Sequence, residues 1–396
     1  MPGLYVHIPF CERKCIYCSF YSIETFNGRE RYLRAVVREM EFRREDLERQ
    51  GVGIPTFDTV FLGGGTPSLL SPEEIGRIFE GLRVSYTIDP AAEITMECNP
   101  GALQESWLEG YRDLGVNRLS FGVQSFHDDE LRFLSRIHTA AEAESSIELA
   151  RRHFENVSLD LIFALPDQTP ERWRANLRRG VELGTGHVSA YSLIFEEGTR
   201  LNAMRLAGEV RPAPDDREAD MYEETMRTLA AVGFGQYEVS NYARPGRECR
   251  HNLGYWERST YLAFGPSAHG FVRGATPPFR WANISNLGAW QEAIEREVLP
   301  AHACEDLAPI QEIEETVYLG LRSRGIPLDA FRELAGIELS AAAPGVIGAM
   351  IDRGHAESID GRLRLTVNGY PFADRYAVGM IEQIEQSLPI TTKDHR

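Results

Sequence analysis

Residues 4–18 read LYVHIPFCERKCIYC, a short apolar stretch followed at once by three cysteines, Cys11, Cys15 and Cys18. Soft thiolate ligands suit iron–sulfur clusters or zinc, and three of them in one tight loop can hold three corners of a cluster. A cluster held in this way keeps one iron open to a further ligand. The alternative is a structural zinc site with His7 as fourth ligand, but such sites usually bring two pairs of ligands, and no second pair is evident.

Short apolar stretches alternate with helical patterns over the first two thirds of the chain. The predicted strands begin near Leu4, Asp58, Glu93, Arg118, Val157 and His187. Such stretches are typical of strands that are buried on both faces of a parallel sheet. An apolar stripe at 32–40, capping boxes at 71–74 and 139–142, and the pair Thr169-Pro170 predict helices between them. Six βα units in a row predict an α/β barrel or open parallel sheet, with the site at the C-terminal strand ends.

The pattern changes beyond about residue 300. Apolar spacing predicts helices at 310–321, 328–334 and 346–351, and the turn Asp360-Gly361 lies between two short strands at 355–359 and 362–367. Three helices followed by a hairpin predict a small α+β domain of winged-helix-like type. Folds of this type often bind DNA, but this stretch has no basic stripe, so we expect no nucleic-acid partner.

Composition excludes several classes of protein. The 396 residues are 43% hydrophobic, as in an ordinary globular protein, and carry 42 Lys and Arg against 59 Asp and Glu, a net charge of −17. This acidic balance argues against non-specific binding to nucleic acid or to anionic membranes. Neither an apolar run of membrane-spanning length nor a secretory signal is visible, and we therefore expect a cytoplasmic protein.

The cysteine spacing, with Tyr17 before the third cysteine, resembles the signature of the radical S-adenosylmethionine (SAM) superfamily. Residues 5–10 narrow the resemblance to the HemN/HemW family, which comprises oxygen-independent coproporphyrinogen III oxidases and a haem-chaperone branch. The resemblance implies a partial (βα)6 TIM-type barrel over residues 1–235, a connecting segment over 236–303, a HemN-type C-terminal domain over 304–380 and a tail over 381–396. It also implies a [4Fe-4S] cluster on the three cysteines, with SAM on the open iron.

The same resemblance implies a set of SAM-binding residues at the strand ends. They are Tyr5, Tyr17, Gly64, Gly65, Thr66, Glu97, Gln124, Arg136, Asp160, Ser192 and, by a looser match, His269. The glycines match a segment whose exposed backbone holds the amino group of SAM, where a Cβ would block the approach. Arg136 is suited to pairing with the SAM carboxylate. Taken singly, each of these residues is equally well explained as a cap on a loop, and the glycine run as a tight turn.

Two features separate the branches of this family. The oxidases have a fourth cysteine at the position of Phe20, and they carry an N-terminal arm, whereas here only four residues precede Tyr5. In addition, His251-Asn252-Leu253-Gly254-Tyr255-Trp256 matches the His-Asn-x-x-Tyr-Trp motif that is implicated in haem binding by the chaperones. A neutral imidazole can ligate haem iron, and the aromatic rings offer apolar surface. The alternative is that His251 hydrogen-bonds locally and the aromatic residues belong to the core.

These features favour a haem chaperone that binds a cluster, SAM and haem and passes haem to an acceptor protein. By resemblance we also expect a homodimer that depends on the cluster and a transient membrane-protein partner. The first alternative is an enzyme of the coproporphyrinogen III dehydrogenase type, which would convert propionate side chains to vinyl groups. The second is a radical SAM enzyme with an unrelated substrate. Cys249 is either a further haem ligand or a packed residue.

Overall fold

The computed structural model describes residues 1–101 and 103–388 and divides into two compact units. Unit 1 comprises residues 1–235, 240–254 and 259–305, and unit 2 comprises residues 236–239, 255–258 and 306 onward. Each unit has a buried apolar core of its own.

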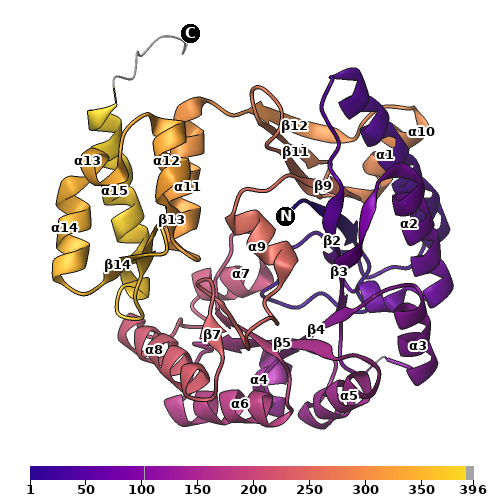
Figure 1. The fold of residues 1–396 in the computed structure, drawn as a ribbon. Coiled ribbons are helices and arrows are strands. Elements are labelled where there is room, and N and C mark those ends of the chain that lie inside the picture. The colour runs from indigo at the N-terminus through magenta and orange to yellow at the C-terminus, as the bar shows by residue number, and fades with distance from the viewer. Residues whose placement is uncertain (102, 389–396) are drawn as a thin grey trace. The chain divides into compact units, whose positions relative to one another are not determined.

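Unit 1 is built on a twelve-stranded sheet with the order β12-β11-β10-β9-β1-β2-β3-β4-β5-β6-β8-β7 (Figure 1). The strands β1 to β6 run parallel to one another. Their bounds are β1 Gly3–Ile8, β2 Phe57–Gly64, β3 Ile88–Cys98, β4 Arg118–Gln124, β5 Asn156–Phe163 and β6 His187–Ser192. The six predicted strands are thus confirmed, and together with their helices they form the α/β architecture expected.

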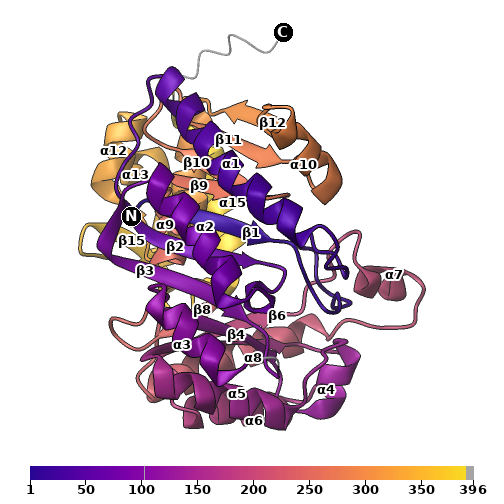
Figure 2. The same cartoon turned by 90° about the vertical axis from the view of Figure 1, so that its right-hand side faces the viewer.

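Helices cover the outer face of these strands, and Figure 2 shows α1 and α2 side by side in front of β1 to β3. The bounds in unit 1 are α1 Arg29–Arg49, η1 Pro67–Leu69, α2 Pro72–Ser85, α3 Glu105–Asp113, α4 Asp128–Phe133, α5 Ala140–His153, α6 Pro170–Glu182, α7 Arg200–Leu206, α8 Asp215–Ala231, α9 Arg250–Trp256 and α10 Leu287–Glu295. The predicted capping boxes at Ser71 and Thr139 are formed, and Thr169 caps α6. None of the helices in the described ranges combines the length and the apolar character needed to cross a bilayer.

The inner face of the parallel strands differs from the apolar face that the sequence predicts. Leu4, Val6 and Ile8 of β1 are fully buried, whereas the alternate positions Tyr5 and His7 contact other polar and aromatic residues. The same alternation recurs on the neighbouring strands, because successive side chains of a strand point to opposite faces. Only the outer face is the apolar layer that packs under the helices.

Shorter strands extend the sheet at both edges. Their bounds are β7 Gly235–Gln236, β8 Asn241–Ala243, β9 Tyr261–Phe264, β10 His269–Val272, β11 Phe279–Asn283 and β12 Ala301–Asp306. The buried Glu39 links α1 to the strands on the β9 side of the sheet. Its carboxylate accepts hydrogen bonds from Gly265 N at 2.7 Å, Asn283 Nδ2 at 2.6 Å and Trp290 Nε1 at 3.2 Å. Burial raises the pKa of Glu39 to about 7.

Unit 2 is the small α+β domain predicted from the sequence, with additions. Its elements are α11 Pro309–Leu321, β13 Ile326–Pro327, α12 Leu328–Ala335, α13 Leu339–Ala342, α14 Pro344–Asp352, β14 Ala356–Ile359, β15 Arg362–Leu365, η2 Tyr370–Phe372 and α15 Ala373–Ser387. The predicted hairpin is β14–β15, and β13 joins it in the order β13-β15-β14. Met380 and Ile384 of α15 are buried in the core of the unit.

The compact units divide the chain at different places from the predicted domains. Residues 236–303, expected as a connecting segment, are shared between the two units. The expected tail at 381–396 begins inside α15, because the apolar spacing of that helix continues to Ile384. Residues 389–396 of that tail lie outside the described part of the chain.

Candidate functional site at the C-terminal ends of the strands

The three predicted cluster ligands lie in one loop that leaves the C-terminal end of β1. Cys11, Cys15 and Cys18 are all half-buried. A bridge between Phe10 and Ile23 closes the base of the loop, and Cys11 N donates to Ile23 O at 3.0 Å. The loop therefore holds three thiols together at the end of the sheet that we call the mouth, formed by the C-terminal ends of β1 to β6.

Two side chains from elsewhere in unit 1 approach the cysteine sulfurs. Thr66 Oγ1 lies 3.7 Å from Cys11 Sγ, and Arg136 Nη1 lies 3.4 Å from Cys15 Sγ. Burial raises the pKa of Cys11 and raises that of Cys18 to about 11, so the loop alone does not favour the thiolates. Iron supplies the positive charge that holds such groups deprotonated, and donors to sulfur are typical of cluster sites. These residues fit an iron–sulfur cluster.

The zinc alternative fits less well. Within the described residues, no three His, Cys, Asp or Glu side chains converge on a single metal ion. Zinc needs such convergence, whereas each thiolate of a cluster loop binds a different iron. His7 already uses both ring nitrogens, because Nδ1 lies 3.1 Å from the Tyr5 hydroxyl and Nε2 lies 2.8 Å from Tyr21 O.

Asn99, which the sequence did not single out, links the residues that approach the sulfurs. Its Nδ2 donates to Thr66 Oγ1 at 2.9 Å, and its Oδ1 accepts from Arg136 Nη2 at 2.8 Å. Arg136 Nη2 also donates to Gly122 O at 2.6 Å. Arg136 Nε is buried without a hydrogen-bond partner among the described residues. That unused donor suits an anionic ligand such as a carboxylate.

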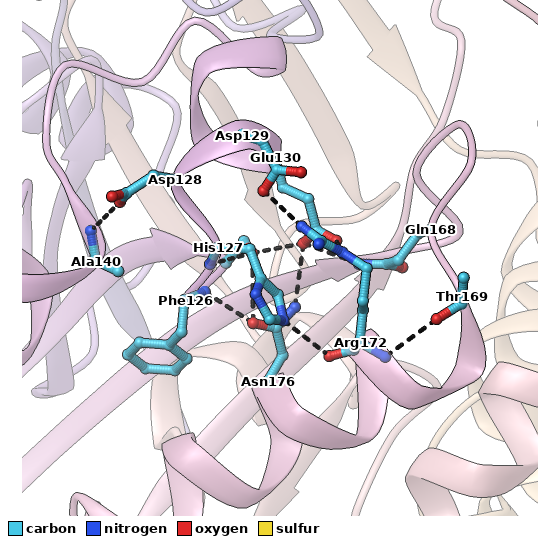
Figure 3. A network of polar contacts seen from close by, with 11 residues as sticks. Phe126, His127, Asp128, Asp129, Glu130, Ala140, Gln168, Thr169, Arg172 and Asn176 are labelled. Atoms are coloured by element: carbon cyan, nitrogen blue, oxygen red, sulfur yellow. Dashed lines mark hydrogen bonds and ion pairs between the residues drawn. The ribbon is translucent and has the colours of Figure 1, made fainter.

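A buried network fixes α4, the helix that leads to Arg136 (Figure 3). At its centre is Glu130, whose carboxylate accepts from Ser125 Oγ at 2.5 Å, Arg172 Nε at 2.8 Å, Gln168 Nε2 at 3.1 Å and Asn176 Nδ2 at 3.2 Å. Arg136 N in turn donates to Leu131 O of α4 at 2.9 Å. The network therefore holds the segment that carries the guanidinium.

The predicted glycine segment is explained here by close packing. A Cβ on Gly64, whose φ is +107°, would lie 2.6 Å from the His7 ring, and a Cβ on Gly65 would lie 2.6 Å from Phe10 O. Gly65 N and Thr66 N already donate to Ile8 O and Phe10 O. Glycine is needed because this segment lies directly against the base of the cysteine loop.

Two half-buried carboxylates, Glu97 and Asp160, lie close to the glycine segment. Glu97 Oε2 accepts from Gly64 N at 3.1 Å, and burial together with the charge of Asp160 raises the pKa of Glu97 to about 8. Burial likewise raises the pKa of Asp160, although Ser120 Oγ donates to it at 3.4 Å. The nearby Tyr5 phenol has a raised pKa, first from burial and then from Glu97. A cationic amine bound here would favour the charged forms of these carboxylates.

Two other predicted SAM residues lie at the mouth. Tyr17 is half-buried in the cysteine loop, where burial raises its pKa and the Arg136 guanidinium opposes that shift. Gln124 ends β4 in the left-handed region, with φ of +72°, where the register between β4 and β5 shifts. A non-glycine residue in that region is uncommon and marks a tightly determined turn.

Ser192 and His269 are less closely tied to the other predicted residues. Ser192 ends β6, and its hydroxyl donates to Glu218 Oε1 of α8 at 2.5 Å. His269 is exposed on β10, outside the six parallel strands. Both residues therefore lie outside the chain of hydrogen bonds that joins Thr66, Asn99 and Arg136.

The His251 motif lies at the opposite end of the parallel strands, which we call the floor. Figure 2 shows α9 beside the N-terminus, at the other end of the sheet from the loop that follows β1. His251 is 3% exposed, its Nδ1 lies 2.7 Å from Thr59 Oγ1, and its ring stacks on Phe61 at 5.1 Å. Burial lowers the pKa of His251 to about 3, so its ring is neutral. A Cβ on Gly3 would lie 2.8 Å from this ring.

Glu93 of β3, which was also not singled out, anchors the start of α9. Its carboxylate accepts from Arg250 N at 3.1 Å, His251 N at 3.1 Å and Cys249 Sγ at 3.6 Å. Cys249 is therefore a packed, hydrogen-bonded thiol in this conformation. The first-turn N–H groups of a helix favour such a carboxylate.

Three further residues of the motif, Asn252, Tyr255 and Trp256, are half-buried. Asn252 belongs to unit 1, whereas Tyr255 and Trp256 are grouped with unit 2. In unit 2, the buried Arg258 that follows them pairs with Glu312 at 3.5 Å and Glu315 at 3.0 Å. The motif, which lies within the single helix α9, therefore contributes residues to both units.

Comparison with known proteins identifies the family. A model of the Radical SAM superfamily matches residues 5–179, and one of the HemN C-terminal domain matches residues 307–372. The protein named heme chaperone HemW in Bacillus subtilis is 35% identical over 374 residues, which cover 93% of this chain and 96% of that protein. The one with this name in Mycobacterium tuberculosis strain H37Rv is 35% identical over 378 residues, covering 94% of this chain and 93% of that protein.

A solved structure agrees in fold. Escherichia coli HemN, named coproporphyrinogen III oxidase, matches with a TM-score of 0.79 and 22% identity over 96% of this chain and 89% of that chain. At such identity the match shows the architecture alone. The identity and coverage of the curated relatives go further: this chain belongs to the HemW family of radical SAM proteins.

Proposed function

We propose that this protein is a haem chaperone that binds a [4Fe-4S] cluster, SAM and haem and passes haem to an acceptor protein. The observation that carries the proposal is the likeness, over more than nine tenths of the chain, to proteins named heme chaperone HemW. The mouth supports the cofactor part, because its three cysteines lie in one loop with hydrogen-bond donors directed at two of the sulfurs.

Cys11, Cys15 and Cys18 would hold the cluster, which when bound supplies an iron with an open position beside SAM. Arg136, with its unpartnered Nε, would pair with the SAM carboxylate, and Glu97 would accept hydrogen bonds from the SAM amine. The other predicted contacts would surround SAM from the strand ends. They are Tyr5, Tyr17, Gly64, Gly65, Thr66, Gln124, Asp160, Ser192 and His269.

We propose residues 251–256 as the haem-binding motif. The buried position of His251 means that haem can reach it only after a local change of structure. His251 is buried and bonded to Thr59, so ligation of haem iron requires the start of α9 to leave Glu93. The test is a haem titration of His251→Ala, with His187→Ala as matched control. His187 is also buried and bonds a hydroxyl, Ser158 Oγ at 2.8 Å. A weakened or shifted Soret band in His251→Ala alone would support the motif, and equal behaviour of the two variants would remove His251 from the proposal.

We place this function in the cytoplasm, because a loop with three free thiols persists in a reducing compartment. The acceptor protein, a homodimer that depends on the cluster and a transient membrane-protein partner belong to the same proposal. Size-exclusion chromatography with and without the cluster tests the dimer.

The alternative function is oxygen-independent coproporphyrinogen III oxidation, which is considered because a model of the HemN C-terminal domain matches residues 307–372. Phe20 argues against it, because this 64% exposed side chain stands where the oxidases have a fourth cysteine. The test uses one anaerobic, cluster-loaded preparation in two assays. One follows transfer of haem to a haem-free globin, and the other supplies coproporphyrinogen III, SAM and a low-potential reductant.

The chaperone proposal predicts haem transfer without new vinyl groups on the porphyrin. Release of CO2 with vinyl formation that depends on the cluster would overturn it in favour of the oxidase.

A further inference from the structure

His355 lies between α14 and β14, where its ring is held on two sides. Its Nδ1 lies 2.7 Å from the Tyr376 hydroxyl of α15, and the ring stacks on Phe372 with centroids 5.0 Å apart and planes 5° from parallel. Its backbone is also fixed, since His355 N donates to Met350 O and Thr366 N donates to His355 O, both at 2.9 Å. The imidazole is therefore oriented by both its backbone and its neighbours.

The other ring nitrogen of His355 has no such partner. Nε2 makes no hydrogen bond or ion pair with any residue in the described ranges, and the residue is half-buried. Metal-ligating histidines commonly have one ring nitrogen fixed by a neighbouring group, which sets the tautomer and leaves the other nitrogen to the metal. This arrangement suits a metal ligand.

The exposed side chains near this histidine in the chain include two apolar residues, two arginines, and the aspartates Asp352 and Asp374 that precede those arginines. Phe372 is 42% exposed, and Val367, which follows the Thr366 bonded to the His355 backbone, is 46% exposed. Arg353 and Arg375 flank His355 and Tyr376 in sequence, and both are exposed. Neither arginine pairs with a carboxylate among the residues that the structure describes. Figure 1 shows α14, β14 and α15 gathered in this part of unit 2.

We propose that His355 Nε2 is an axial ligand for haem on the surface of unit 2. The ligand chemistry follows from the site: an imidazole for the iron, apolar side chains for the macrocycle, and two arginines for the propionates. The proposal rests on the proposed haem-chaperone function and deepens it, because it supplies a ligand that needs no movement of α9.

His302 provides a matched control for the imidazole alone. Its Nδ1 lies 3.2 Å from Ala282 O, and it is exposed on the edge strand β12. In contrast to His355, it stacks on no aromatic ring among the described residues. If any exposed histidine attracted haem, His302→Ala and His355→Ala would act alike.

The test is an anaerobic titration of the full-length, cluster-loaded protein with ferric haem, followed by the Soret band. We expect His355→Ala to weaken binding at least tenfold and to shift the band, and His302→Ala to match wild type. Tyr376→Phe, which removes the hydroxyl beside Nδ1, should weaken binding several-fold while retaining the ring. Free imidazole should restore the wild-type band in His355→Ala, an effect that a merely unfolded variant would not show. Metal-free protoporphyrin should bind wild type and His355→Ala equally.

The outcomes separate this proposal from the proposed function. A wild type that takes up no haem saturably would overturn both. Saturable binding that His355→Ala leaves unchanged would overturn this proposal and leave the chaperone function standing. A loss in His355→Ala that imidazole does not rescue would show a structural role and would equally overturn ligation.

Discussion

The mouth and the floor of the parallel sheet carry similar polar side chains, which differ in how many hydrogen bonds they form. At the mouth, Arg136 Nε has no partner among the described residues, and the half-buried Glu97 lies beside a second carboxylate. At the floor, the Glu93 carboxylate accepts from three donors, and Thr59 holds His251. The free donor of Arg136 beside the cysteine loop suits a ligand, whereas the hydrogen-bonded groups of Glu93 and His251 stabilise the fold.

The largest effect that the comparison predicts is loss of the cluster from the mouth. Replacing Cys11, Cys15 and Cys18 by alanine should remove all bound iron and sulfide and the brown colour of the anaerobic protein, because these thiolates are the ligands. The matched control is Cys98→Ala, since Cys98 is buried and donates to Met96 O at 3.8 Å. Retained iron and sulfide in the triple variant would refute the assignment.

At the floor, Glu93→Ala should lower the free energy of unfolding by about 3 kcal/mol, because it leaves the donors at the start of α9 without their buried acceptor. Urea unfolding measures the loss. Iron content and SAM affinity should stay at wild-type values. An unchanged free energy of unfolding, or a selective loss of SAM binding, would contradict the claim that Glu93 stabilises the floor and takes no part in the site at the mouth.

Arg136→Ala should weaken SAM binding by about 30-fold, or about 2 kcal/mol, because it removes a charge-assisted pair with a carboxylate. Equilibrium dialysis against labelled SAM, with the cluster content measured in parallel, gives the affinity. Arg132→Ala is the matched control, as an exposed arginine of α4, the helix that precedes Arg136. Equal affinities of the two variants would exclude Arg136 from the SAM site.

Thr59→Val should cost about 1 kcal/mol of stability, because the buried His251 Nδ1 loses its partner. If the Thr59 bond competes with haem ligation, this variant should also bind haem more tightly than wild type. Denaturant unfolding and a Soret titration measure the two effects. Tighter haem binding without loss of stability would contradict the role given to this bond.

The smallest effect is a pH dependence of the cluster-free protein. The pKa of Glu97 rises from 4.5 to about 8 on folding, so the folded state retains a proton that the unfolded chain has released. The contribution of Glu97 to stability is therefore fully present below pH 4.5 and falls as pH rises through 8, by less than about 1 kcal/mol per pH unit. Glu97→Gln should flatten the slope, and an unchanged slope would show that Glu97 is not the group responsible.

Local signals made the strands, the capped helices and the cysteine loop predictable. Ser71 and Thr139 cap helices through contacts within four residues, and the cysteine spacing needs no tertiary information. Asn99 was missed because its role depends on Thr66 and Arg136, which adjoin it only in the folded chain. The whole of α15 was missed, because no helix was predicted beyond the hairpin that ends near residue 367.

Burial of the haem motif was the least predictable feature. His251 is hydrogen-bonded to Thr59, which lies 192 residues away in sequence. Its backbone N–H, at the start of α9, donates to Glu93, which lies 158 residues away. Nothing near residue 251 signals either partner. The same limit hid the polar inner face of the sheet, because the contacts of one strand depend on its neighbours.

The most direct test of the central claim is an anaerobic haem titration of the cluster-loaded wild-type protein, followed by absorbance at the Soret band. The haem-chaperone account predicts a saturable curve with a fixed endpoint and a defined band. A linear rise without an endpoint, as for haem adhering to apolar surface, would contradict it.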